Sequence, residues 1–366
     1  VNVSRRRYER LELPQRHGRA VMPEIAAIDM REEKLPASRW LSSKLADALT
    51  DNLAAGEQSM LFLNRRGYAP LTLCRECGHR LACPSCSSWL VDHRLTGRLQ
   101  CHHCGFTTVK PERCSECGGT STLVACGPGV ERVAEEIGEI VPNARMAIMA
   151  SDTISSPSHA AELIERMVAR EIDVLVGTQI VAKGHHFPML TLVGVVDADL
   201  GLTGGDLRAA ERTYQLLAQV AGRAGRAEHP GRVLLQTYGP NHPVMQALIS
   251  GNRDHFVASE TNEREHHDLP PFGRLAAVIV SAPDERGGLE ACGAIANRIP
   301  AGLDGARILG PAPAPLFLLR GRYRHRFLVM AQRHVNIQGL VRDWLGTYTP
   351  PIRVRVQIDI DPYSFL

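Results

Sequence analysis

Short apolar runs alternate along much of the chain with longer segments in which apolar residues recur at the spacing of a helix. The runs predict strands, and the periodic segments predict helices. The expected strands are 59–63, 144–149, 172–176, 191–196 and 232–236, and the expected helices are 38–53, 129–140, 158–170 and 207–220. This alternation is typical of a parallel sheet with helices on both faces, so we expect an α/β fold.

The pattern changes in two places. Between 73 and 120 cysteine, glycine and polar residues dominate, so we expect an insertion that interrupts the sheet. After residue 240 the apolar spacing predicts one helix over 243–264, followed by alternating short elements, which indicates a small α+β domain. The expected divisions are a linker at 1–22, the sheet domain in two parts at 23–72 and 121–240, the insertion at 73–120 and the C-terminal domain at 241–366.

The composition is that of an ordinary globular protein, with 44% hydrophobic and 22% charged residues. A length of 366 residues predicts two or three domains. No run approaches the roughly 20 apolar residues that span a bilayer, and the arginine-rich start does not resemble a signal peptide. We therefore expect a cytoplasmic location and no membrane partner. A start on Val1 in a polar stretch favours a piece of a longer protein.

Positive charge is local, although the formal net charge is only +3. All but four of the 42 basic residues are arginine, and they cluster at 5–7, 65–66 and 320–326. The guanidinium fork suits phosphate, which favours a nucleic-acid partner. A solvated surface is the alternative for each cluster.

Eight of the ten cysteines form four Cys-x-x-Cys pairs. The pairs are Cys74 with Cys77, Cys83 with Cys86, Cys101 with Cys104, and Cys114 with Cys117. A tight turn aims both sulfurs of a pair at one ion, and Gly78, Gly105 and Gly118 supply the positive φ that such turns often need. Two four-thiolate zinc sites would use all eight. Disulfides would need an oxidising compartment, and a thioredoxin-type motif would need one pair in a βαβ unit.

The grouping of the pairs has two solutions. The two inner pairs are separated by 14 residues, 87–100, which is close to the spacing of a zinc ribbon and favours a nested arrangement. Sequential pairing would leave only five residues between Cys77 and Cys83, which is tight but feasible. Closed four-thiolate sites are structural, so we expect no metal chemistry. The other donors are His79, His102 and His103, expected at the surface or behind the ligands, and Cys126 and Cys292, expected as buried thiols.

The segment Gly177 to Pro188 carries groups suited to a phosphate backbone. Thr178 offers a hydroxyl, Gln179 an amide and Lys183 an ammonium group; an ordinary polar loop is the alternative. Nearer the start, Arg65 and Arg66 follow an apolar strand, and either could contact DNA or a nucleotide, although a surface salt bridge is nearly as well supported.

The segment Gln219 to Arg226 follows the first by 42 residues. Gly222 and Gly225 let the main chain pass close to a neighbour while Arg223 and Arg226 project, as do arginines that complete a nucleotide site. We expect both segments at the carboxyl edge of the sheet, where ligands of open α/β sheets bind.

The sequence contains no Gly-Lys-[Ser/Thr] of a phosphate-binding P-loop. Its four lysines are Lys34, Lys44, Lys110 and Lys183, preceded by Glu, Ser, Val and Ala. We therefore expect another segment to hold the nucleotide, and no hydrolysis by this chain alone. Asp197-Ala198-Asp199 could imitate a magnesium-binding motif, but without the lysine a structural or coupling role is favoured.

Together these segments resemble the C-terminal half of the PriA family of replication-restart helicases. The matching segments are 62–70, the eight-cysteine insertion, 177–188, 219–226, 269–272 and 359–362. The resemblance implies the second RecA-like motor lobe of an ATP- and magnesium-dependent superfamily-2 DNA helicase that moves 3′ to 5′. It also implies the nested grouping of two zinc ions, and as partners forked and single-stranded DNA, primosome proteins and single-strand-binding protein.

The resemblance also assigns roles to residues. Arg226 and Arg223 would complete the nucleotide site with Gln219, Gly222 and Gly225. The implied DNA contacts are Thr178, Gln179, Lys183, Arg65 and Arg66. The family's first motor lobe, with its P-loop, is not in this sequence, and 1–22 would lead from it. A zinc-stabilised binding module for DNA and proteins is the alternative function; a zinc-ribbon factor of transcription or redox function would leave 177–188 and 219–226 unexplained.

Overall fold

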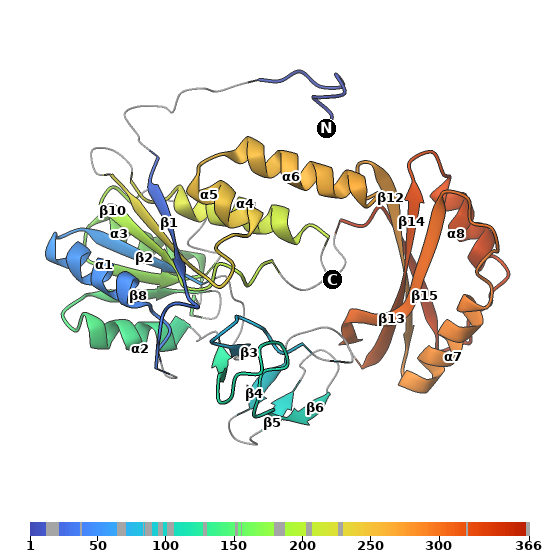
Figure 1. Cartoon of the computed structure of the whole chain (residues 1–366), viewed down its shortest axis with the longest axis horizontal. Coiled ribbons are helices and arrows are strands. Elements are labelled where there is room, and N and C mark those ends of the chain that lie inside the picture. The colour runs from blue at the N-terminus through green and yellow to red at the C-terminus, as the bar shows by residue number, and fades with distance from the viewer. Residues whose placement is uncertain are drawn as a thin grey trace.

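The chain forms three sheets, which Figure 1 shows in a computed structural model of the protein. The structure describes residues 1–11, 22–36, 39–63, 71–82, 84, 90–93, 98–100, 106–126, 130–150, 153–154, 156–178, 187–202, 207–225, 230–319 and 321–363. Within these ranges no helix is both long and apolar enough to span a lipid bilayer.

The largest sheet has six strands in the order β1-β11-β10-β2-β9-β8, and every neighbouring pair is parallel. The strands are β1 (Glu24–Asp29), β2 (Gln58–Phe62), β8 (Met146–Met149), β9 (Val174–Gly177), β10 (Leu190–Val195) and β11 (Arg232–Thr237). The predicted parallel sheet is confirmed, and its five predicted strands lie within two residues of the expected bounds. The sequence reasoning did not identify β1.

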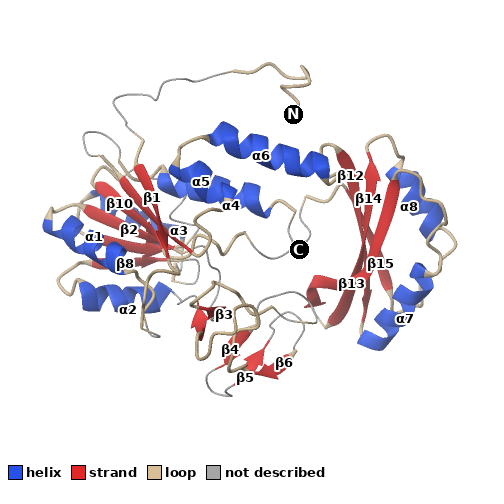
Figure 2. Cartoon of the chain, viewed as in Figure 1, coloured by secondary structure: helices blue, strands red, loops and turns tan. Residues whose placement is uncertain are grey.

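Helices cover both faces of this sheet (Figure 2). The helices are α1 (Ser43–Ala54) and α2 (Val130–Ile140) on one face, and α3 (Pro157–Val168), α4 (Ala209–Ala221) and α5 (Pro243–Ile249) on the other. Alternate residues of β2 point to opposite faces: Leu61 packs with the first group, and Met60 and Phe62 pack with the second. Burial on both faces explains why the strands read as continuous apolar runs.

The helix predicted over 243–264 is two helices, α5 and α6 (Arg253–His266). The break follows from two residues between them. Gly251 has φ +65°, a left-handed conformation that does not continue a helix. The Asn252 side chain then accepts a hydrogen bond from the His255 N–H at 2.9 Å and starts the next helix.

The insertion forms an antiparallel sheet of five short strands in the order β6-β5-β4-β3-β7. The strands are β3 (Leu71–Cys74), β4 (Val91–His93), β5 (Arg98–Gln100), β6 (Thr107–Val109) and β7 (Leu123–Cys126). It lies in the chain between β2 and α2. Because β3 pairs with β7, the chain leaves and rejoins the parallel sheet through adjacent strands.

The C-terminal region is an antiparallel sheet with helices on one face, as the predicted α+β class requires. Its elements are β12 (Gly273–Ala282), α7 (Glu285–Ala296), β13 (Ala306–Leu319), β14 (Arg322–Gln332), α8 (Ile337–Leu345) and β15 (Arg355–Ile360). Phe327 and Trp344 meet edge to face in its core, with ring centroids 5.4 Å apart. In the sheet order β13-β14-β12-β15, the β13 side contributes Phe317 to the apolar cluster of the insertion.

Candidate functional site

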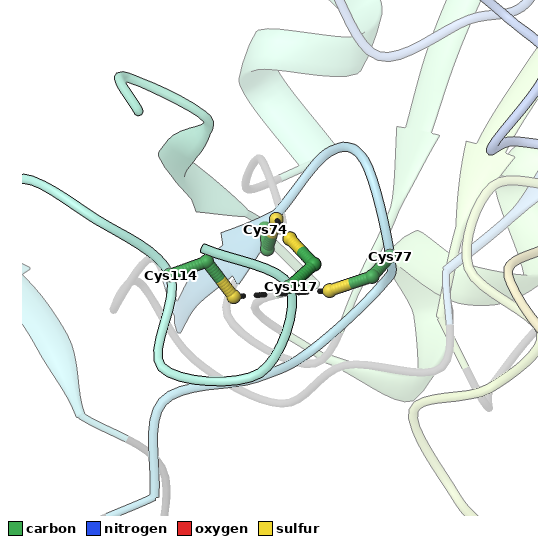
Figure 3. A group of neighbouring side chains, drawn as sticks. All are labelled: Cys74, Cys77, Cys114 and Cys117. Carbon is green, nitrogen blue, oxygen red and sulfur yellow. Dashed lines mark hydrogen bonds between the residues drawn. The ribbon is translucent and has the colours of Figure 1, made fainter. Parts of the chain in front are cut away.

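Four cysteines of the insertion converge on one point (Figure 3). They are Cys74, Cys77, Cys114 and Cys117, and their sulfurs all lie within 4.8 Å of one another. Cys74 Sγ is 3.6 Å from Cys117 Sγ, and Cys77 Sγ is 3.7 Å from Cys114 Sγ. Four sulfurs at 2.3 Å from a tetrahedral zinc would be roughly 3.8 Å apart. The geometry therefore fits a four-thiolate zinc site made by the two outer pairs.

Two backbone turns of the same type present the two cysteine pairs. The Cys74 N–H donates to the His79 carbonyl at 2.7 Å, and the Gly78 N–H donates to the Cys74 carbonyl at 2.9 Å. In the second turn Cys114 N–H donates to the Gly119 carbonyl, and Gly118 N–H to the Cys114 carbonyl, both at 2.9 Å.

The glycine that follows each pair allows this turn. Gly78 has φ +78° and Gly118 has φ +74°, so the prediction of left-handed glycines after these two pairs is confirmed.

The thiols of the first pair differ in acidity. At Cys74 burial opposes ionisation, but the hydrogen bond with Thr122 and backbone hydrogen bonds from Cys77 and Glu76 outweigh it and lower the pKa to about 7. At Cys77 burial and the neighbouring thiols raise the pKa to about 12. Ligand thiols must lose their protons to bind a metal, so a divalent cation would supply the attraction that ionises the remaining thiols.

Other predicted donors take ordinary places. His79 Nε2 lies 3.2 Å from the Ser115 hydroxyl, which gives this ring a hydrogen-bond partner outside the sulfur cluster. Cys292 is fully buried in the core of the C-terminal sheet, as predicted.

The Asp197-Ala198-Asp199 segment follows β10 at the carboxyl edge of the parallel sheet. Both carboxylates bind protein groups. Asp197 accepts from Arg80 Nη2 at 2.8 and 3.0 Å, and Asp199 accepts from the Tyr238 N–H at 2.7 Å. Burial, and then the neighbouring Asp197 charge, raise the pKa of Asp199. These contacts agree with the structural interpretation of the segment.

The Gln219 segment lies at the amino edge of the sheet, not at the carboxyl edge that the sequence reasoning predicted. Its Gly225 N–H donates to the carbonyl of Leu190, the first residue of β10, at 3.1 Å. The physical reason is that α4 runs back across the sheet before β11 starts, so residues after the helix reach the strand starts. Gln219 is exposed near the end of α4, and Gly222 is its C-cap.

Gly225 is needed where the main chain passes another strand. A Cβ on Gly225 would lie 2.3 Å from the Gly231 nitrogen, and a Cβ on Gly231 would lie 2.3 Å from the Gly225 nitrogen. Gly225 also has φ +68°. The close approach at this glycine is to the chain's own backbone at Gly231, and the nucleotide contact expected of Gly225 stays a prediction.

The segment Gly177 to Pro188 begins at the carboxyl edge of the parallel sheet. Thr178 directly follows β9, is buried, and donates its N–H to the Met149 carbonyl at 3.3 Å. The far end of the same segment, Phe187, packs in one apolar cluster with Val220, Ala221 and Ala224 of the arginine segment. Leu190, the first residue of β10, donates its N–H to the Phe187 carbonyl at 3.2 Å and accepts from the Gly225 N–H at 3.1 Å, so this residue links the two segments.

Several predicted site residues lie outside the described residues. They are Arg65, Arg66, Cys83, Cys86, Cys101, Cys104, Gln179, Lys183 and Arg226. Arg223 is described, half-buried just after α4.

The sequence reasoning missed two arginines beside the first cysteine pair. Arg75 donates to three backbone carbonyls near residues 35–39, and Arg80 bonds to Asp197. Arginines are frequent throughout this chain, so neither position stood out, and only the placement of the insertion against the sheet reveals them.

Comparison with known proteins agrees with these features. Residues 265–363 match the family described as "Primosomal protein N C-terminal domain", and residues 83–108 match "PriA DNA helicase Cys-rich region (CRR) domain". The Replication restart protein PriA of Rickettsia felis is 44% identical over 364 residues, covering 100% of this chain and 56% of the relative. That of Bacillus subtilis is 38% identical over 98% of this chain and 45% of the relative.

Among solved structures, the Pyrococcus furiosus Hef helicase domain matches with a TM-score of 0.28 and 15% identity, over 60% of this chain and 29% of that one. The chain spans about half the length of the curated relatives it matches. Since their similarity extends along its entire length and includes a Cys-rich region and a C-terminal domain that match PriA family descriptions, the chain resembles the C-terminal half of the PriA proteins.

Proposed function

We propose that this chain forms the second motor lobe, the zinc-binding region and the C-terminal domain of an ATP-dependent 3′-to-5′ DNA helicase that restarts replication at branched forks. The observation that carries the proposal is the 44% identity, over the whole chain, to a protein named for replication restart. Forked and single-stranded DNA, primosome proteins and single-strand-binding protein are its proposed partners.

The proposed nucleotide contacts are in the segment after α4. Arg226, and with it Arg223, would reach the γ-phosphate of an ATP whose phosphates and magnesium are held mainly by another lobe. Gln219, Gly222 and Gly225 would shape the approach to the nucleotide. The anchoring of Gly225 to the start of β10 supports this, because arginines stabilise a transition state only when their main chain is held in place.

The proposed DNA contacts are Thr178, Gln179 and Lys183, together with Arg65 and Arg66 after β2. Thr178 follows β9 at the carboxyl edge, and Phe187, near the far end of the same segment, accepts from the N–H of Leu190, whose carbonyl accepts from Gly225 of the arginine segment. A displacement of the arginine segment after hydrolysis would therefore reach the DNA-contacting residues through Phe187 and Leu190. This connection supports a motor function, because it joins the two proposed sites within one chain.

The proposed zinc ligands are two groups of four cysteines. Cys74, Cys77, Cys114 and Cys117 would hold one ion, and the inner cysteines, Cys83, Cys86, Cys101 and Cys104, would hold the second. The distances between the sulfurs support the first group. Both sites would be structural.

The test uses the longest reading frame that contains this sequence. Arg226→Ala and Arg223→Ala are expected to lower DNA-stimulated ATP hydrolysis, at Arg226 by about 10³-fold or more, as for other transition-state arginines. Fork binding should remain, since these residues are not proposed to touch DNA. Arg232→Ala, at the exposed start of β11, is the matched control. Unchanged hydrolysis in both variants would reject the proposed role.

A second candidate function is a binding module without catalysis, and the sequence observation that favours it is the lack of Gly-Lys-[Ser/Thr]. On this view the chain alone binds forks but hydrolyses no ATP. Fork affinity should fall steeply with salt, because phosphate contacts release counterions. Hydrolysis by the chain alone above the level of its Arg226→Ala variant would refute this view, and so would the absence of fork binding at low salt.

A further inference from the structure

The first cysteine turn is joined to the carboxyl edge of the parallel sheet by a partly buried ion pair. The Arg80 side chain, only 5% exposed, faces Asp197, which is 21% exposed. Arg80 Nη2 donates to both carboxylate oxygens, at 2.8 and 3.0 Å. Asp197 Oδ1 also accepts from the Asp199 N–H at 3.1 Å, so the same carboxylate shapes its own loop.

A second arginine joins the same turn to the segment before α1. Arg75 lies between Cys74 and Cys77. Its Nη1 donates to the carbonyls of Leu35 and Pro36, and its Nη2 to that of Arg39, each at 2.7 Å.

The Arg75 guanidinium also lies over the Trp40 ring, 5.6 Å from its centroid. One side chain of the cysteine turn therefore holds the segment from Leu35 to Trp40 from outside.

The inner side of that segment is held by the core. Buried Glu136 accepts from the N–H groups of Trp40 and Leu41, at 2.8 and 3.1 Å. Buried Gln236 accepts from the Ser42 N–H at 2.7 Å and donates to the Trp40 and Val196 carbonyls at 2.9 and 3.1 Å. The segment thus has fixed partners on both sides.

A third contact joins the main chain of Gly78 to the Tyr238 side chain. A Cβ on Gly78 would lie 2.6 Å from the Cβ of Tyr238, so the turn rests directly on the residue after β11. Tyr238 in turn donates its N–H to Asp199. The turn therefore touches the loops after β10 and β11 as well as the segment before α1.

We propose that Arg75 and Arg80 are positioning residues through which metal binding at the outer cysteine site sets the conformation of residues 35–36, 39–42 and 196–199. The inference rests on the proposed zinc site. Because binding free energy at a structural zinc site is folding free energy, the turn that carries both arginines has a defined shape only when the metal is bound. Without it, the two guanidinium groups lose their fixed positions opposite the sheet.

The test is amide hydrogen exchange on the full chain, with zinc content measured on the same samples. Removal of zinc by a chelator is expected to speed exchange in 35–36, 39–42 and 196–199, on the order of 10-fold, as ordinary coupling energies allow. Arg75→Ala should speed exchange in 35–36 and 39–42 and leave 196–199 nearly unchanged. Arg80→Ala should do the reverse. Both variants should keep their zinc.

Two further variants test specificity. Arg98→Ala, exposed on β5 of the same insertion, should change neither segment. The double variant Arg80→Asp with Asp197→Arg restores an ion pair of reversed polarity. Its rate of amide exchange in 196–199 should lie between that of Arg80→Ala and that of the parent. A loss of packing alone would give no such recovery.

The outcomes separate two failures. If the chain loses zinc on chelation and both segments exchange as before, the coupling is refuted while the zinc site stands. If the chain binds no zinc at all, the zinc site itself fails and the coupling to it fails with it. Faster exchange in the Arg75 and Arg80 variants would then assign the two links to the protein fold alone.

Discussion

The parallel sheet and the cysteine-rich sheet lie side by side but are stabilised differently. All six residues of β10 are buried, between apolar clusters on both faces. In the described part of the insertion, β6 is mostly exposed, and two members of the buried cluster, Cys74 and Cys114, are themselves proposed metal ligands. Another member, Phe317, comes from the C-terminal sheet. The parallel sheet therefore depends on apolar burial. The cysteine-rich insertion depends on a bound metal and on its contacts with the neighbouring sheets.

The largest expected effect is loss of metal. Cys114→Ser should remove zinc from the outer site and unfold the two cysteine turns, since structural zinc sites contribute about 10 kcal/mol or more of apparent binding free energy. The parallel sheet should keep its strands, because its clusters contain no proposed ligand. Zinc analysis with circular dichroism checks this.

Cys292→Ala is the matched control, because it changes a buried thiol of the C-terminal core and should leave the zinc content intact. Collapse of the parallel sheet together with the turns in Cys114→Ser would contradict the comparison.

The second largest effect is expected from a substitution in the core of the parallel sheet. Phe62→Ala should lower the free energy of unfolding of the parallel sheet by about 3–5 kcal/mol, as expected for a fully buried aromatic residue. Zinc content should not change. Denaturant unfolding with zinc analysis measures both. Val109→Ala, 70% exposed on β6, should cost almost nothing. A loss of zinc from Phe62→Ala would show that the two regions are not independently stabilised.

A smaller effect is expected at Glu136. Glu136→Ala leaves the N–H groups of Trp40 and Leu41 without their acceptor, and should lower the free energy of unfolding at pH 7 by about 1–3 kcal/mol. Exposed Glu135→Ala is the control. Equal costs in the two variants would show that the carboxylate does not hold the segment before α1.

The cost at Glu136 should depend on pH. Burial raises the pKa of Glu136, so the folded state binds a proton more readily than the unfolded state. Its contribution to stability therefore increases as pH falls through the folded pKa, and the cost of Glu136→Ala should be larger at pH 5 than at pH 7. Denaturant titrations at the two pH values measure this, and a cost that shrinks toward pH 5 would contradict the sign.

The smallest effect is expected at Asp173, where the hydrogen-bonded Arg145 guanidinium lowers the pKa of the carboxyl. A lowered pKa stabilises the fold above the unfolded value and loses that contribution as pH falls through the folded value. Asp173→Asn should therefore be slightly less stable than the parent at pH 7 and equal to it in strong acid. Unfolding midpoints at both pH values test this, and a difference that grows in acid would reject the assignment.

The sequence predicts most of the parallel sheet, because strands buried on both faces read as apolar runs. It does not reveal β1, whose Glu-Ile-Ala-Ala-Ile-Asp is weakly apolar and lies at the sheet edge. The break at Gly251 was missed because one glycine does little to an otherwise helical pattern. The amino-edge position of Gly225 was within reach of the sequence, because this residue lies between the predicted helix 207–220 and the predicted strand 232–236 of a parallel sheet, and the chain must return to the amino edge before that strand.

The cysteine pairs were predictable because two ligands on one turn leave a local pattern in the sequence. The nested grouping requires pairs that are far apart in the chain, and the structure brings the outer two together. The contacts of Arg75 and Arg80 leave no such pattern. Their partners lie 36 to 117 residues away, so only three-dimensional placement relates them.

The pairing of β3 with β7 means that the insertion departs and returns through two points about 5 Å apart, the usual distance between antiparallel partners. A module attached in this way could be gained, lost or exchanged during evolution without rerouting the strands of its host. Such an insertion could first have been tolerated without a function of its own. Contacts such as that between Arg80 and Asp197 would then have coupled it to the parallel sheet.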